Sequence, residues 1–213
     1  MRRPFLFCLM MLAASPAAGA PDYSRLEYFP AELHMSRVEC QLGPKRMQLP
    51  LLSDFHDAWF SKHLAAAKEP SLFEQSLKPP QDMVASYRFT WLRSFHAPII
   101  VRIDEERSGV MQLTAKRLSG QGGYDPGHLD GVINRPLTAK EGEDVHRAFM
   151  ASDFATFRPN PCDIATDGAQ WVVEARAGGK YRVVHQQSPQ KGPIGRIGLV
   201  LLSLTNWKIG LVY

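Results

Sequence analysis

The stretch Ala169–Gln187, AQWVVEARAGGKYRVVHQQ, decides the fold class, because a glycine pair divides two runs rich in β-branched and aromatic residues. This pattern predicts a β-hairpin. We expect a three-residue loop over residues 177–179, which pairs Trp171 with His185 and keeps the apolar side chains on one face. A two-residue loop would mix polar and apolar side chains on each face and is less favoured.

Three more segments upstream of the hairpin alternate between apolar and polar residues with a period of two. They cover residues 87–92, 99–104 and 111–115 and are joined by short links. Such spacing is typical of an antiparallel meander. Residues 119–136 are rich in glycine and are expected to form a loop.

Helical patterns flank these strands. Residues 49–68 are expected to form a helix that Ser53 can cap, and capping boxes at Ser71 and Thr138 open two more. The apolar segment 194–207 is expected to be a core helix. Together the elements predict an α+β fold, an antiparallel sheet of about five strands with helices packed mainly on one face.

The N-terminus has the layout of a secretory signal peptide. Arg2 and Arg3 precede a short apolar core at residues 4–14, and small residues follow up to Ala20. The core is too short to span a bilayer, which needs about 20 apolar residues. We expect cleavage after residue 17, 19 or 20 and a periplasmic or secreted chain without a transmembrane segment.

The expected signal peptide affects both the domain limits and the net charge of the mature chain. The expected organisation is a signal peptide at 1–20, an irregular and helical segment at 21–80 that includes 21–50 without clear period, and an α+β domain at 81–213. Removing the signal's two arginines lowers the formal net charge from +4 to +2. No run of Lys or Arg concentrates that charge, so a nucleic-acid partner is not expected.

Signal cleavage also removes Cys8 and leaves two cysteines, Cys40 and Cys162. In an oxidising compartment an even pair favours a disulfide. A disulfide between them would close a loop of about 120 residues. In the chain-entropy model such a bridge stabilises the folded state by roughly 4–5 kcal/mol. The alternative is a pair of buried thiols too far apart to react.

The polar residues offer few metal sites, and no cofactor is expected. His56 and His63 lie two turns apart on one predicted helix, about 10.5 Å along the axis, which is too far for one ion. Asp125, His128 and Asp130 could converge in their glycine-rich loop, but turn-forming residues explain most of this motif. A metal site there is the weaker interpretation.

The sheet face left open by the helices is the better candidate for binding. In the preferred register Glu174 lies opposite Arg182, most simply as an exposed ion pair worth under about 1 kcal/mol. A partner or a small anion could dock on this face. Its candidate residues are Arg88, Arg102, Glu174, Arg182 and Gln186.

Several motifs resemble a family of small exported bacterial proteins without an assigned activity. They are D-G-A-Q-W-V-V-E at 167–174, Y-R-V-V at 181–184, S-P at 188–189, Y-R-F-T-W-L-R at 87–93 and G-G-Y-D-P-G at 122–127. The family often carries an acidic residue and a tryptophan near His185 and Gln187, where this chain departs from it. The resemblance spans about 86–207 and implies domain limits, not a reaction.

Three functions follow as hypotheses, one of them an extracytoplasmic protein that holds a partner through its N-terminal helices. No Gly-x-Ser-x-Gly elbow or other catalytic pattern occurs, so a non-enzymatic binding or interaction module for an envelope protein or a small ligand is favoured. The alternative is a small exported hydrolase or metal-assisted enzyme, with its polar site on the sheet face or in the 120–130 loop.

Overall fold

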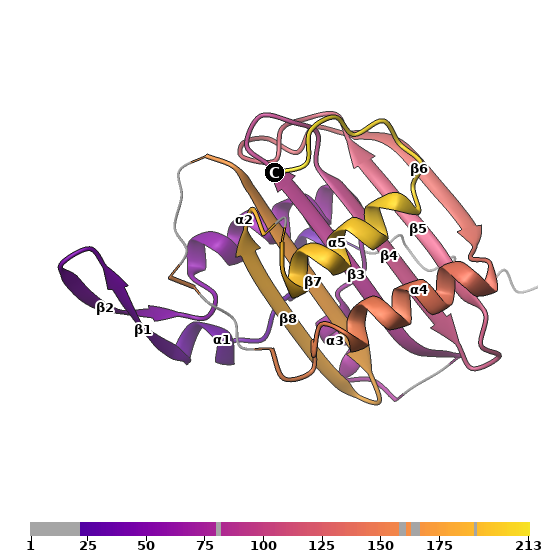
Figure 1. Cartoon of the computed structure of the whole chain (residues 1–213), viewed down its shortest axis with the longest axis horizontal. Helices are drawn as coiled ribbons and strands as arrows, with labels where there is room; N and C mark the ends of the chain where they lie inside the picture. Colours follow the sequence, from indigo (N-terminus) through magenta and orange to yellow (C-terminus); the bar gives the residue numbers. More distant parts are fainter. Residues whose placement is uncertain (1–21, 80–81, 158–160, 163–166, 190) are drawn as a thin grey trace, which may run out of the picture.

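A computed structural model of the chain describes residues 22–79, 82–157, 161–162, 167–189 and 191–213 (Figure 1). The expected signal peptide lies outside these residues. The elements in chain order are η1 Tyr23–Arg25, α1 Glu32–Met35, β1 Arg37–Leu42, β2 Lys45–Pro50, α2 Asp54–Ala66, α3 Leu72–Ser76, β3 Met83–Arg93, β4 Ile99–Glu106, β5 Met111–Leu118, β6 Leu129–Pro136, α4 Ala139–Met150, β7 Ala169–Ala177, β8 Lys180–Gln187 and α5 Pro193–Ser203.

The main sheet has six strands in the order β6-β5-β4-β3-β7-β8, and all its neighbouring strands are antiparallel. This arrangement confirms the α+β class and the meander of β3, β4 and β5. The additional strand is β6, within residues expected to form a loop. It is an exposed edge strand that turns mainly Ile133 towards the core, so its sequence carries little apolar alternation.

Helices cover both faces of this sheet, instead of mainly one. On one face α4 and α5 pack over a core centred on Phe89, Trp91 and Trp171. On the other face α2 and the segment before it bury Phe60 against Val172. Figure 1 shows α4 and α5 on one side of the sheet and α2 on the other. Because the N-terminal segment supplies this second layer, the central strands are buried on both sides.

The β7–β8 hairpin has a two-residue turn, so the expected three-residue loop is wrong. Gly178 and Gly179 have φ angles of +55° and +72°, the geometry of a tight primed turn. Trp171 therefore pairs with Gln186, and His185 pairs with Val172 on the opposite face. The expected register assumed that one face of the hairpin is exposed to solvent. With both faces buried, alternation of polar and apolar residues does not select the register.

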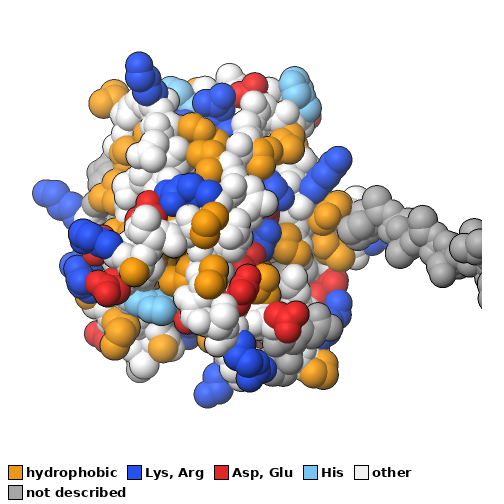
Figure 2. Space-filling model, turned by 90° about the vertical axis from the view of Figure 1, so that its right-hand side faces the viewer, with side chains coloured by type: hydrophobic (Ala, Val, Ile, Leu, Met, Phe, Trp, Pro, Cys, Tyr) orange, Lys and Arg blue, Asp and Glu red, His pale blue; other side chains and the backbone are white. Residues whose placement is uncertain are grey.

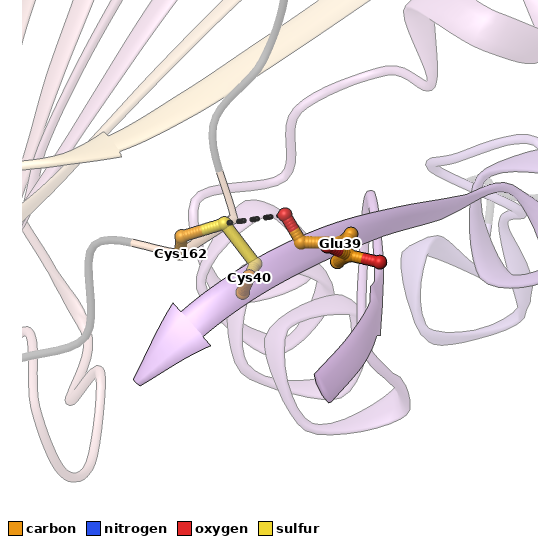
Figure 3. The surroundings of a disulfide bond; sticks show 3 residues. All are labelled: Glu39, Cys40 and Cys162. Atoms are coloured by element: carbon orange, nitrogen blue, oxygen red, sulfur yellow. Dashed lines mark hydrogen bonds between the residues drawn. A yellow bond between two sulfur atoms is a disulfide. The ribbon is translucent and has the colours of Figure 1, made fainter. Parts of the chain in front are cut away.

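A second hairpin, β1–β2, occupies the region expected to be irregular and projects from the body of the protein (Figure 1). The predicted disulfide between Cys40 on β1 and Cys162 is present, with the two Cα atoms 5.2 Å apart. Figure 3 shows Cys162 beside the carbonyl oxygen of Glu39, which lies 3.9 Å from its sulfur. The bridge ties this hairpin to the segment that precedes β7.

The surface carries charges of both signs, as the small net charge leads us to expect. Figure 2 shows Lys and Arg side chains interspersed with Asp and Glu on the face that it displays. Within the described ranges, the structure contains no helix that is both long and apolar enough to cross a membrane.

Candidate functional site

The five residues of the expected binding face lie on two different faces of the sheet. Arg88, Arg102 and Glu174 point towards the layer formed by α2 and α3. Arg182 lies on the other face, where its Nη2 donates to the Phe157 carbonyl and its guanidinium lies 5.9 Å from the Phe154 ring centroid. Gln186 pairs with Trp171 on that same face. The predicted pair of Glu174 with Arg182 therefore does not form.

Glu174 is instead bound to Arg88 on the neighbouring strand. The Nε and Nη2 atoms of Arg88 each donate to one carboxylate oxygen of Glu174 at 2.7 Å, and both side chains are fully buried. The remaining guanidinium nitrogen, Nη1, donates to the Pro70 carbonyl at 2.6 Å. This is a bidentate arrangement, which is geometrically specific and strong.

Glu69 joins the same group from the loop between α2 and α3. Its carboxylate lies 2.9 Å from Arg102 Nε, 2.6 Å from Lys116 Nζ and 3.6 Å from Arg88 Nη1. We call Glu69, Arg88, Arg102, Lys116 and Glu174 the buried ion cluster. It connects the layer of α2 and α3 to β3, β4, β5 and β7.

Mutual pairing within the buried ion cluster favours the charged forms of Glu69 and Arg88. Burial acts to raise the pKa of Glu69, but Arg102, Arg88 and Lys116 together hold that pKa below its ordinary value. Burial would lower the pKa of Arg88, and Glu174 more than reverses this effect. Burial and Glu174 raise the pKa of Tyr181, whose hydroxyl donates to Glu174 at 2.8 Å. These groups hold one another in place and are poorly suited to transfer protons.

The residues of the candidate metal loop are bound locally. Asp125 accepts from the Gly127 backbone N–H at 2.7 Å, and His128 Nδ1 lies 3.0 Å from Ser119 Oγ. Asp130 accepts from Arg117 at 2.9 Å. Among the described residues no group of three His, Cys, Asp or Glu side chains is placed to hold an ion. These contacts stabilise the turn and the β5–β6 pairing.

The sequence did not reveal a cavity of about 450 Å³ between α2, the loop before β6 and the ends of β3, β7 and β8. We call it the aromatic cavity; its main lining side chains are Phe55, His56, Trp59, Tyr124, Gln170 and Gln187. The first three lie on the N-terminal half of α2, which Ser53 caps as expected by accepting from the His56 N–H.

Ring contacts organise the α2 wall of the aromatic cavity. The Phe55 and Trp59 ring centroids are 5.6 Å apart, and His56 stacks on Trp59 at 6.1 Å. The Trp59 indole N–H donates to the Gly122 carbonyl at 2.6 Å and fixes the loop that carries Tyr124. Phe55 and Tyr124 remain 69% and 56% exposed. Phe55 recurs at helical spacing with Trp59 in the sequence, and its exposure is set by how α2 packs.

The inner polar side chains of the aromatic cavity are His56, Gln170 and Gln187, and the exposed Asp167 also lines it. Burial and the neighbouring His185 lower the pKa of His56 to about 4. Its Nδ1 lies 2.9 Å from Ser53 Oγ, and its ring centroid is 4.8 Å from that of His185. Gln170 donates to Gln187 at 2.6 Å at the ends of β7 and β8. An apolar wall with a few fixed polar groups is the usual composition of a small-molecule site.

Comparison with known proteins adds no family to this description: no protein-family model matches the chain, and no curated protein matches it significantly.

Proposed function

We propose that the chain is an exported, non-enzymatic binding module that holds a small, largely aromatic ligand in the aromatic cavity. The observation that carries this proposal is the cavity itself, with exposed rings at its rim and the side chains of His56, Gln170 and Gln187 inside. Its volume lies within the range of about 300–1,000 Å³ that small-molecule sites occupy. An aromatic ligand would stack on rings that are already oriented by their neighbours.

The alternative, a small hydrolase or metal-assisted enzyme, has less support. Glu69 and Glu174 on the sheet face are held by guanidinium and ammonium groups. The Ser53 hydroxyl lies close to His56, but it serves as the cap of α2 and the lowered pKa of His56 makes this imidazole a weak base at neutral pH. An envelope protein that inserts an aromatic side chain into the same cavity is compatible with the binding proposal.

The test is an NMR titration of the oxidised chain without its signal, with p-cresol as the aromatic probe and cyclohexanol as the aliphatic one. We expect saturable shifts at the amides of α2 and of residues 122–124, with tighter binding of p-cresol. Phe55→Ala should weaken p-cresol binding about fivefold, since an aromatic pair contributes about 0.5–1.5 kcal/mol beyond burial.

The matched control is Leu77→Ala, because Leu77, at the C-terminal end of α3, does not line the aromatic cavity and is as exposed as Phe55, at 69%. A second variant, Leu49→Trp, places an indole at the cavity rim and should block the probe without unfolding the chain. Absence of saturable shifts, or equal effects of Phe55→Ala and Leu77→Ala, would refute the proposal.

Export is supported separately by the residue 1–20 pattern and by the disulfide. Fractionation of cells that express the full chain should recover a shortened, disulfide-bonded product outside the cytoplasm. Replacing both Arg2 and Arg3 with Glu should slow its processing. An uncleaved product that stays in the cytoplasm would contradict export.

A further inference from the structure

A second candidate site lies at the other end of β3 and β7, around Arg176. This arginine is the penultimate residue of β7 and is only 8% exposed. Its Nη2 donates to Ser86 Oγ at 3.2 Å. Its Nε is buried and has no hydrogen-bond partner among the described residues. A buried guanidinium in this condition is unfavourable unless another group satisfies it.

The neighbouring carboxylates are already paired with other cations. Ser86 Oγ donates to Asp104 at 2.7 Å, and the other oxygen of Asp104 pairs with Arg102. Within the described part of the chain no carboxylate lies within ion-pair distance of Arg176. Together with the buried ion cluster, four cations (Arg88, Arg102, Lys116 and Arg176) face three anions (Glu69, Glu174 and Asp104). Among these described groups, one positive charge has no counter-charge.

Arg176 lines a cavity of about 530 Å³ whose other polar walls include Lys78, Asp82, Arg102 and Asp104. Lys78 and Asp82 are exposed at its edge, while Arg102 and Asp104 neutralise each other. Burial also lowers the pKa of Arg176, as expected for a cation without a counter-ion. The excess positive charge is therefore directed into a space large enough for a small molecule.

We propose that this cavity, which we call the anion cavity, binds a small oxyanion, a carboxylate or a phosphate, through the Arg176 guanidinium with Lys78 at its rim. A planar guanidinium matches two oxygens of either group, and Lys78 adds an adaptable ammonium donor. The site is independent of the aromatic cavity, which lies at the opposite ends of β3 and β7. A ligand bound only in the folded state would stabilise the protein.

Thermal unfolding of the oxidised chain tests the anion cavity, with inorganic phosphate and succinate as probes and sodium chloride at matched ionic strength as the reference. We expect the wild-type Tm to rise saturably with one or both probes above the chloride value. A response to phosphate alone or to succinate alone identifies the preferred oxyanion. The rise should disappear in Arg176→Met.

Arg182→Met is the matched control, because Arg182 also has a buried Nε without a hydrogen bond but lies on the other face of the sheet. It should keep the full response. If Arg176→Met does not fold, Lys78→Met, at an exposed position, should weaken the response several-fold without changing the Tm in chloride. An identical rise in wild type, Arg176→Met and Lys78→Met, or no rise above chloride in wild type, overturns the proposal.

Discussion

Replacing Glu174 with glutamine tests the central electrostatic feature of this fold, because it leaves the Arg88 guanidinium buried without its main counter-ion. The change preserves shape and removes one negative charge. Arg88 would keep the Pro70 carbonyl at 2.6 Å and the Glu69 carboxylate at 3.6 Å. Tyr181 would lose a charged acceptor for its hydroxyl.

The expected loss of stability follows from the contacts. Two hydrogen bonds to a charged group, both 2.7 Å long, are weakened, and each such bond contributes about 1.5–3 kcal/mol. Breaking a buried ion pair by removing one partner typically destabilises by about 3–5 kcal/mol. Because Glu69 remains nearby, we expect about 3 kcal/mol, which lowers the Tm of a chain this size by roughly 6–12 °C.

Urea unfolding at pH 7 measures this effect, with Asp144→Asn as the control. Asp144 pairs with Lys140 on the surface of α4 and should contribute less than about 1 kcal/mol. The double variant Arg88→Met, Glu174→Leu removes both charges and should recover most of the loss. If Glu174→Gln also costs less than about 1 kcal/mol, Glu174 behaves as the exposed residue that the sequence pattern predicted opposite Arg182, and the reasoning from the structure fails.

Three further perturbations follow from other parts of the structure. The bridge between Cys40 and Cys162 closes a sequence separation of 122 residues. The double variant Cys40→Ala, Cys162→Ala should therefore lower the free energy of unfolding, by at most about 5 kcal/mol. A wild-type Tm that reductant leaves unchanged would contradict this. Burial lowers the pKa of His56 to about 4 and also that of His185, so the folded state binds fewer protons than the unfolded state. Stability should therefore be full above about pH 6.5 and fall towards pH 4. In the double variant His56→Gln, His185→Gln the midpoint of urea unfolding should depend less on pH. A Cβ added at Gly198 would lie 2.4 Å from a core indole carbon, so Gly198→Ala should destabilise by about 1–3 kcal/mol in thermal unfolding, and an unaltered Tm would show that α5 packs less closely.

Features that depend on neighbouring residues could be predicted from the sequence. Ser53, Ser71 and Thr138 cap helices as expected, because each hydroxyl accepts an N–H only three residues away. The full capping box forms at Thr138, whereas the expected box at Ser71 does not, since the Glu74 carboxylate accepts from the Glu27 N–H. The strands β3, β4 and β5 follow from period-two patterns and short links. The disulfide followed from cysteine number and the expected compartment.

The candidate site was less predictable, because its contacts join distant residues. Arg88 and Glu174 are 86 residues apart in the chain. The aromatic cavity joins α2 to strand ends and to the loop at Tyr124. Phe55 could not be identified as a rim residue, since a helical stripe has the same spacing whether it faces a core or an opening.

The sequence by itself therefore determined the α+β class, the helix caps and the cysteine pair, and it predicts export from the cytoplasm. Only the tertiary structure decided the hairpin register, the partner of Glu174 and the position of both cavities. The physical reason is the second helical layer. Once the N-terminal segment covers the remaining face of the sheet, polar side chains there lose water and must find partners from other strands and loops.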